Sequence, residues 1–266
     1  MALTLDTITL GVPQVKAAHA FYTAALSPLP GVENDTAELD LHGTGHLAVR
    51  QFDDLATEVG ADPVTEGFRG YVLSSIVSQP SEVKALLEAA ANNGATVVKP
   101  AKKQFFGEFT AVYRAPDGAV WKLAAAAKKD TGPRTDPPKP TETAIYLGVA
   151  KPKASKVFYE RLGMGVDHDY GDKFIDFTVT EGVCRLGLLP RQGLAKDAGV
   201  DPRGDGFSAL VLTHTAASRA EVDALLAAAD SAWGRAVAST ARIDGGEYAG
   251  HFTDPDGYHW KITTPV

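Results

Sequence analysis

The chain has 266 residues, of which 44% are hydrophobic and 22% are charged, and its formal net charge is −7. Such values are typical of a globular protein, and the negative charge argues against nucleic acid as a partner, because phosphate binding needs clustered lysine and arginine. No apolar run approaches the roughly 18 residues of a membrane-spanning helix, and the single Cys184 excludes an internal disulfide. We therefore expect a cytoplasmic protein that does not bind membranes.

The first half of the chain predicts a strand, a helix and then further strands. The segment 7–12 is short and β-branched, which favours a strand. Phe21, Tyr22, Ala25 and Leu26 recur at helical spacing and predict an amphipathic helix. The remaining elements are strands within 37–51 and 70–77, a helix within 81–94, and a hairpin within 107–125 whose Ala-Pro-Asp-Gly suits a type I turn.

The second half repeats the first. LATEVGADPVTEGF at 55–68 matches LAKDAGVDPRGDGF 139 positions later, and the hairpin GEFTAVYRAPDGAVWKLAA matches GEYAGHFTDPDGYHWKITT at the same offset. Between the halves, the segment 129–141 is rich in proline and charge and predicts a linker. We therefore predict two related domains, at residues 1–128 and 142–266.

This fourfold strand-helix-strand-strand pattern, with Phe-Tyr in the first helix and Pro-Asp-Gly before the last strand, resembles the vicinal oxygen chelate superfamily. That superfamily includes glyoxalase I, bleomycin-resistance proteins and extradiol dioxygenases. The resemblance implies an α+β fold of four βαβββ modules that form two glyoxalase-like domains, each with a cupped mixed sheet and helices outside. It also implies that each half builds one cup, as in two-domain extradiol dioxygenases.

In this superfamily a divalent metal sits at the base of the cup, held by histidine and glutamate. The matching positions in this chain hold neither residue type, and an ammonium group at such a position would repel a cation. We therefore expect no metal and no other cofactor. The matching positions are Thr7 and Ala144, Arg50 and Leu188 or Leu189, Arg69 and Ser208, and Lys122 and Lys261.

Strand alternation predicts which side chains point into the cups. If Lys122 and Lys261 point inward, His259 shares their face, and Trp121 and Trp260 point toward the helices. A turn that pairs Tyr113 with Val120 and Phe252 with His259 would make aromatic walls and would place His251 on the helix side. The predicted ligand-binding residues are Lys122, Tyr113, Phe109, Arg69, Lys261, His259, Phe252, Tyr248 and Tyr146.

These residues predict a protein that binds a small aromatic or anionic molecule without a metal. The repeated inward lysines would then meet an anionic ligand or a carboxylate neighbour; alternatively, they reach solvent or pair with Glu108 or Glu247. A second hypothesis is an enzyme, either a metal-dependent lyase or dioxygenase with unusual ligands such as His251, Glu247 and His259, or a metal-free acid–base catalyst. A third is a scaffold without an open cup. Whether the chain is an enzyme stays open, and we expect a monomer or a homodimer.

Overall fold

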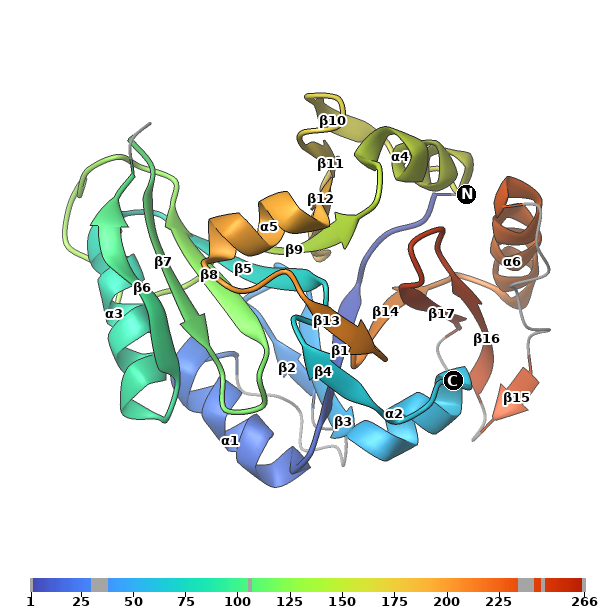
Figure 1. Cartoon of the computed structure of the whole chain (residues 1–266), viewed down its shortest axis with the longest axis horizontal. Coiled ribbons are helices and arrows are strands. Elements are labelled where there is room, and N and C mark those ends of the chain that lie inside the picture. The colour runs from blue at the N-terminus through green and yellow to red at the C-terminus, as the bar shows by residue number, and fades with distance from the viewer. Residues whose placement is uncertain (1, 30–37, 105–106, 234–241, 245–246, 265–266) are drawn as a thin grey trace.

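Two mixed β-sheets, which we name sheet A and sheet B, form the framework of the protein (Figure 1). Each sheet has a concave side, which we call cup A and cup B. None of the helices in the described part of the chain is long and apolar enough to cross a membrane. The computed structural model describes residues 2–29, 38–104, 107–233, 242–244 and 247–264.

Sheet A has the strand order β15-β16-β17-β14-β1-β3-β2. Its centre is the antiparallel pair of β1 and β14, in which Thr7 lies opposite Thr213. The pairs β1–β3 and β14–β17 on either side of this centre are parallel. The strands are β1 (Thr7–Val12), β2 (Glu38–Asp40), β3 (His46–Gln51), β14 (Leu210–Thr215), β15 (Arg242–Asp244), β16 (Glu247–Thr253) and β17 (His259–Thr263).

Sheet B has the order β10-β11-β12-β9-β5-β8-β7-β6 and the same plan. Here β5 and β9 form the antiparallel centre, with Ser74 opposite Ala144. Two short strands, β4 (Thr65–Gly67) and β13 (Gly204–Gly206), pair outside both sheets. The strands of sheet B are β5 (Tyr71–Val77), β6 (Thr96–Lys103), β7 (Phe109–Arg114), β8 (Val120–Ala125), β9 (Glu142–Val149), β10 (Val166–Asp169), β11 (Ile175–Phe177) and β12 (Arg185–Pro190).

The α+β fold with two cupped mixed sheets confirms the predicted fold class, but the two halves of the chain are interleaved. Sheet A combines β1–β3 of the first half with β14–β17 of the second, and sheet B combines β5–β8 with β9–β12. The expectation that each half builds its own cup is therefore wrong. Local pattern identifies the four modules, but it does not say which two of them pair.

The linker explains part of this pairing, because it is tied to the first half. Glu82 is 3% exposed, and one of its carboxylate oxygens accepts hydrogen bonds from the Thr135 amide and hydroxyl. Gln79 donates to the carbonyl of Gly132, and the Thr141 amide donates to the carbonyl of Ile76 at 2.7 Å. These contacts lead the chain back along sheet B, so that β9 pairs with β5.

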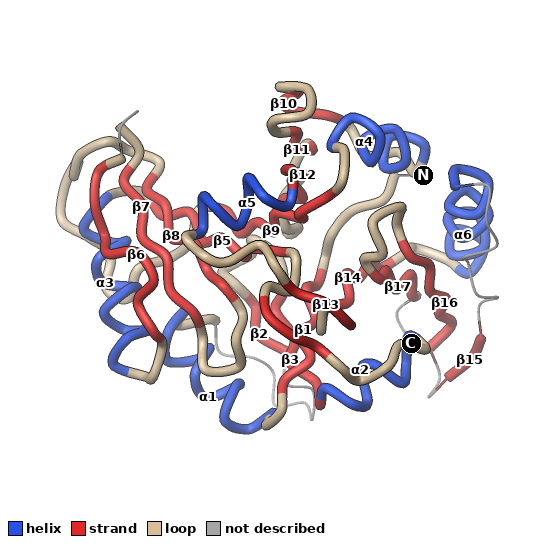
Figure 2. The backbone as a smooth tube through the Cα atoms, viewed as in Figure 1, coloured by secondary structure: helices blue, strands red, loops and turns tan. Residues whose placement is uncertain are grey.

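The helices divide between the two faces of the sheets. Four of them pack on the side of Trp121 and Trp260, which are fully buried in the main core as predicted. The other two, α2 and α5, contribute buried residues to separate clusters on the cup side. Figure 2 shows the four helices of the tryptophan side, α1, α3, α4 and α6, at the edges of the molecule. The helices are α1 (Val15–Leu26), α2 (Phe52–Val59), α3 (Pro80–Asn92), α4 (Pro152–Arg161), α5 (Arg191–Ala198) and α6 (Arg219–Trp233).

Candidate functional site

The two closing hairpins have a register one residue away from the predicted one. In the second hairpin, the amide of Asp254 donates to the carbonyl of Tyr258 at 2.9 Å, and β16 and β17 resume pairing at Thr253 and His259. Phe252 consequently lies opposite Trp260, and the two rings stack at 6.0 Å. A shift of one residue moves every side chain of a strand to the other face.

The predicted aromatic walls are therefore wrong, because these rings face the helices. Tyr113 stacks on Trp121 at 6.3 Å and, like Phe252, is buried in the main core. Phe109 lies under the ammonium of Lys84 from α3, at 5.6 Å from the ring centre. Tyr248 donates its hydroxyl to Asp223 of α6 at 2.7 Å.

Cup A contains a cavity of about 510 Å³ between helix α2 and the strands β17, β14, β1 and β3. Lys261 lines this cavity, as expected from its predicted inward direction. The apolar lining residues are Val15, Ala48, Val49, Leu55 and Val211. Five threonines of the strands contribute hydroxyl groups to its floor: Thr7, Thr9, Thr213, Thr215 and Thr263.

A carboxylate from α2 joins the charged groups of cup A. One oxygen of Glu58 pairs with the guanidinium of Arg50, and the other lies 3.6 Å from Nζ of Lys261. The same oxygen lies 3.6 Å from Nε2 of His251. The prediction for His251 is thus wrong, since it shares the inward face with Lys261, its partner across the two strands. Burial lowers the pKa of His251, so this imidazole is neutral at neutral pH.

Cup B contains an apolar cluster that includes positions where cup A has polar side chains. Leu194, Ala195 and Ala198 of α5 form a buried apolar cluster with strand residues that include Val112 and Val120. Tyr146 packs against this cluster, on the inward side as predicted. Its ring lies so close to the neighbouring strand that a Cβ at Gly187 would meet the ring at 2.6 Å.

Each of the repeated lysines meets a repeated carboxylate. Lys122 donates to Asp197 of α5 at 2.7 Å, and Asp197 stands 139 positions after Glu58, the partner of Lys261. The carboxylate neighbour that the sequence suggested therefore exists in both cups, although Glu108 and Glu247 were the residues considered. The repeated acid was visible in the motif of 55–68, but its closeness to a lysine depends on how the modules pair.

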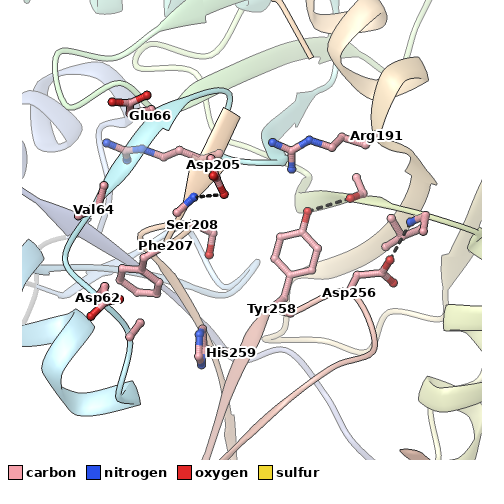
Figure 3. A pocket seen from close by; sticks show the side chains of 17 residues that line it. Asp62, Val64, Glu66, Arg191, Asp205, Phe207, Ser208, Asp256, Tyr258 and His259 are labelled. Carbon is pink, nitrogen blue, oxygen red and sulfur yellow. Dashed lines mark hydrogen bonds between the residues drawn. The ribbon is translucent and has the colours of Figure 1, made fainter. Parts of the chain in front are cut away.

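Arg69 and His259 lie at a second cavity of about 730 Å³ near the β4–β13 pair. In Figure 3, Phe207, Tyr258 and His259 stand around this cleft. Arg69 donates to the carbonyl of Asp117 at 2.6 Å, which ties it to the first hairpin. The His259 ring is 5.6 Å from that of Phe207, and burial lowers its pKa to about 4. The nine predicted residues thus do not share one site.

The comparisons with known proteins agree on a family. Residues 142–262 match the model of the Glyoxalase/Bleomycin resistance protein/Dioxygenase superfamily. The second half of the chain therefore has the sequence pattern of this superfamily, and the first half repeats that half in sequence. A search of curated proteins gave no match.

Solved structures of the superfamily share the fold over nearly the whole chain. Glyoxalase I from Zea mays has a TM-score of 0.63 and 16% sequence identity, over 99% of this chain and 92% of the maize chain. A Bacillus subtilis protein provisionally assigned as a dioxygenase has a TM-score of 0.58 and 15% identity, over 99% of this chain and 85% of the other. At such identities the likeness concerns the fold alone.

The superfamily's metal does not fit the residues on the floors of the two cups. Four register neighbours cross the floor of cup A, namely His46, Thr7, Thr213 and Lys261. The corresponding row in cup B is Arg185, Ala144, Ser74 and Lys122. Neither row contains a carboxylate, and each ends in an ammonium group, which repels a divalent cation. The carboxylates that border the cavity of cup A, Glu38, Asp54 and Glu58, lie outside this row.

One group of side chains elsewhere has the closeness of metal ligands. Within the described residues, this group is Asp167, His168 and Asp176, at β10 and β11. The guanidinium of Arg185 lies 2.8 Å from Asp167 and 3.4 Å from Asp176, so a cation already stands beside these carboxylates, and it also pairs with Glu142. The side chain of Glu247, one of the unusual ligands considered above, lies outside the described residues.

Proposed function

We propose that the protein binds a small polar organic molecule in cup A, without a divalent metal. The observation that supports this most is the difference between the two cups at matched positions of the repeat. Where cup B has Val112 and Leu189, cup A has His251 and Arg50, each 139 positions away. Both cups thus hold an apolar cluster beside their helix, but cup A has polar groups at these matched positions.

The floor of the cups shows the same contrast. Tyr146 of cup B corresponds to Thr9 of cup A, and Gly187, which admits the tyrosine ring, corresponds to Ala48. The hydroxyl, guanidinium and ammonium groups around this hollow can offer a ligand several hydrogen-bonding partners. Its volume of about 510 Å³ falls within the usual range for small-molecule sites.

The prediction of an aromatic ligand is no longer supported, because the aromatic side chains on which it depended face the helices. The remaining chemistry is hydrogen bonding by threonine and charge pairing by Lys261 and Arg50. We therefore propose a ligand with several hydrogen-bonding groups and a modest apolar part.

The double substitution Thr9→Tyr with Ala48→Gly tests this proposal, because it gives cup A the residue pair that fills cup B. A library of small polar molecules would be screened by NMR against the labelled protein and this variant. We expect ligands that shift the amide signals of Thr213 and Lys261, and we expect the variant to lose them while keeping its circular dichroism spectrum. Tyr146→Phe in cup B is the control and should bind as the parent does.

Ligands that persist in the double variant would refute cup A as the site. Elemental analysis of the purified protein tests the second part of the proposal. Stoichiometric iron, zinc, nickel or manganese would contradict metal independence and would favour the alternative of a metal-dependent lyase or dioxygenase.

We also propose that the protein acts as a monomer in the cytoplasm. Each cup combines strands from both halves of one chain, so a second chain is not needed to complete it. The single cysteine is buried, and its burial raises the pKa of the thiol to about 12, which suits a protein without disulfide chemistry. Sedimentation analysis would test the assembly state, and a stable dimer would contradict it.

A further inference from the structure

We propose that the ligand of cup A carries a carboxylate, and that Glu58 occupies the place of this carboxylate when the cup is empty of ligand. This inference rests on the proposed function of cup A. It names the chemical class of the ligand and one side chain that competes with it.

The contacts of Glu58 are those that proteins use to hold a carboxylate ligand. Its two oxygens are divided between the guanidinium of Arg50 on β3 and the ammonium of Lys261 on β17. His251 of β16 adds an imidazole nitrogen at 3.6 Å. Arginine and lysine that converge from separate strands on one carboxylate can form a receptor for an anion: Arg50 makes a charge-assisted hydrogen bond, and Lys261 adds a second positive charge nearby.

Cup B supports the view that this receptor is a specific property of cup A. There the carboxylate of Asp197 meets Lys122, but Leu189 and Val112 stand at the positions of Arg50 and His251. The pair of Asp197 and Lys122 is balanced in charge. In cup A two cations from separate strands, Arg50 and Lys261, meet the carboxylate of Glu58, and Glu38 and Asp54 also line the cavity.

An exchange between Glu58 and a ligand carboxylate needs little movement. Helix α2 is anchored by Leu55 and Ala56, which are buried in a cluster with Phe207 and Val211, and Glu58 takes no part in that cluster. The Glu58 side chain keeps 19% of its surface exposed, so rotation about its own bonds can carry the carboxylate to solvent. The cavity beside it would then hold the rest of the ligand against the threonine floor.

A pair of matched probes tests this proposal on the whole protein. Benzoate and benzamide have nearly the same shape, but benzoate alone carries a charge. We expect benzoate to shift the amide signals of Thr213 and Lys261 in NMR titrations, and we expect benzamide to bind at least fivefold more weakly. Raising the salt concentration should weaken benzoate binding and leave benzamide unchanged.

Two substitutions then separate the receptor from its internal competitor. Glu58→Gln removes the competing charge and should tighten benzoate binding about fivefold, as the loss of a partly exposed ion pair allows. Arg50→Leu introduces the residue of cup B and should weaken benzoate binding by a similar factor. Asp197→Asn, the matched change in cup B, should leave benzoate binding as it is.

The outcomes distinguish this inference from the proposed function. Equal binding of benzoate and benzamide, or a benzoate affinity unchanged by both Glu58→Gln and Arg50→Leu, would overturn the carboxylate inference. If neutral molecules still bind cup A and are lost in the Thr9→Tyr, Ala48→Gly variant, the proposed function stands without it. If no molecule of either kind perturbs cup A, both fall. Should Glu58→Gln fail to fold, the parent protein with the two probes and Arg50→Leu still decide the matter.

Discussion

Replacing Asp254 by asparagine should change how the stability of the protein depends on pH. Asp254 is 2% exposed, accepts a hydrogen bond from the Tyr159 hydroxyl at 2.5 Å, and accepts two more from the amides of Asp256 and Tyr258. Burial outweighs these bonds and raises the pKa of this carboxyl from 3.8 to about 7. The folded protein therefore keeps a proton on Asp254 between about pH 4 and pH 7, whereas the unfolded chain has lost it.

The sign and the size of the effect follow from this difference. Because the folded state binds the extra proton, the contribution of Asp254 to the free energy of unfolding is complete below about pH 4 and is lost as the pH rises toward 7. A change from 3.8 to about 7 corresponds to at most about 4 kcal/mol. Asparagine does not titrate, so the variant should gain stability relative to the parent protein over this window.

Urea unfolding of the parent and the Asp254→Asn variant at pH 4.5, 6 and 8 would measure this. The difference between the two proteins is the informative quantity, since other titrating groups cancel in it. Asp62→Asn, at an exposed position, serves as the control for a general loss of charge. A difference that stays constant across the pH range would refute the reasoning.

Three further predictions concern packing and charge. Phe252→Ala should destabilise the protein by about 3–5 kcal/mol in denaturant unfolding, because the ring is core, and a small effect would mean that it faces the cup. Gly187→Ala should cost about 1–3 kcal/mol, and Tyr146→Thr in the same chain should relieve most of that cost, since the added methyl group meets the tyrosine ring. A double-mutant cycle on Lys122 and Asp197 should give a coupling of at most about 1 kcal/mol, because Asp197 is 51% exposed, and a larger value would show that the pair holds α5 in place.

The sequence alone predicts the parts of the fold that depend on local pattern. The repeat, the four modules and the buried tryptophans follow from spacing and alternation, and the structure confirms them. The inward direction of the two lysines was assumed from the family resemblance, and the structure agrees with it. Each of these features is decided within one or two elements. Periodicity therefore reports them without knowledge of the rest of the chain.

The features that the sequence did not predict depend on a single residue or on distant pairing. The hairpin loop is one residue shorter than assumed, and this alone turned Phe252 toward the helices and His251 toward the cup. The partners of the lysines, Glu58 and Asp197, stand in the repeated motif, but each lies in the opposite half from its lysine. Only the interleaving of the modules brings them together.

Because of this interleaving, substitutions in different strands of the same half affect different cups. Each half of the chain supplies one module to either sheet, so a substitution in β16 or β17 alters cup A and one in β7 or β8 alters cup B. Deleting one half of the chain would leave neither cup intact, because each sheet would lose the strands that this half supplies. A chain built in this way can keep the apolar packing of cup B unchanged while single substitutions alter the side chains that line cup A.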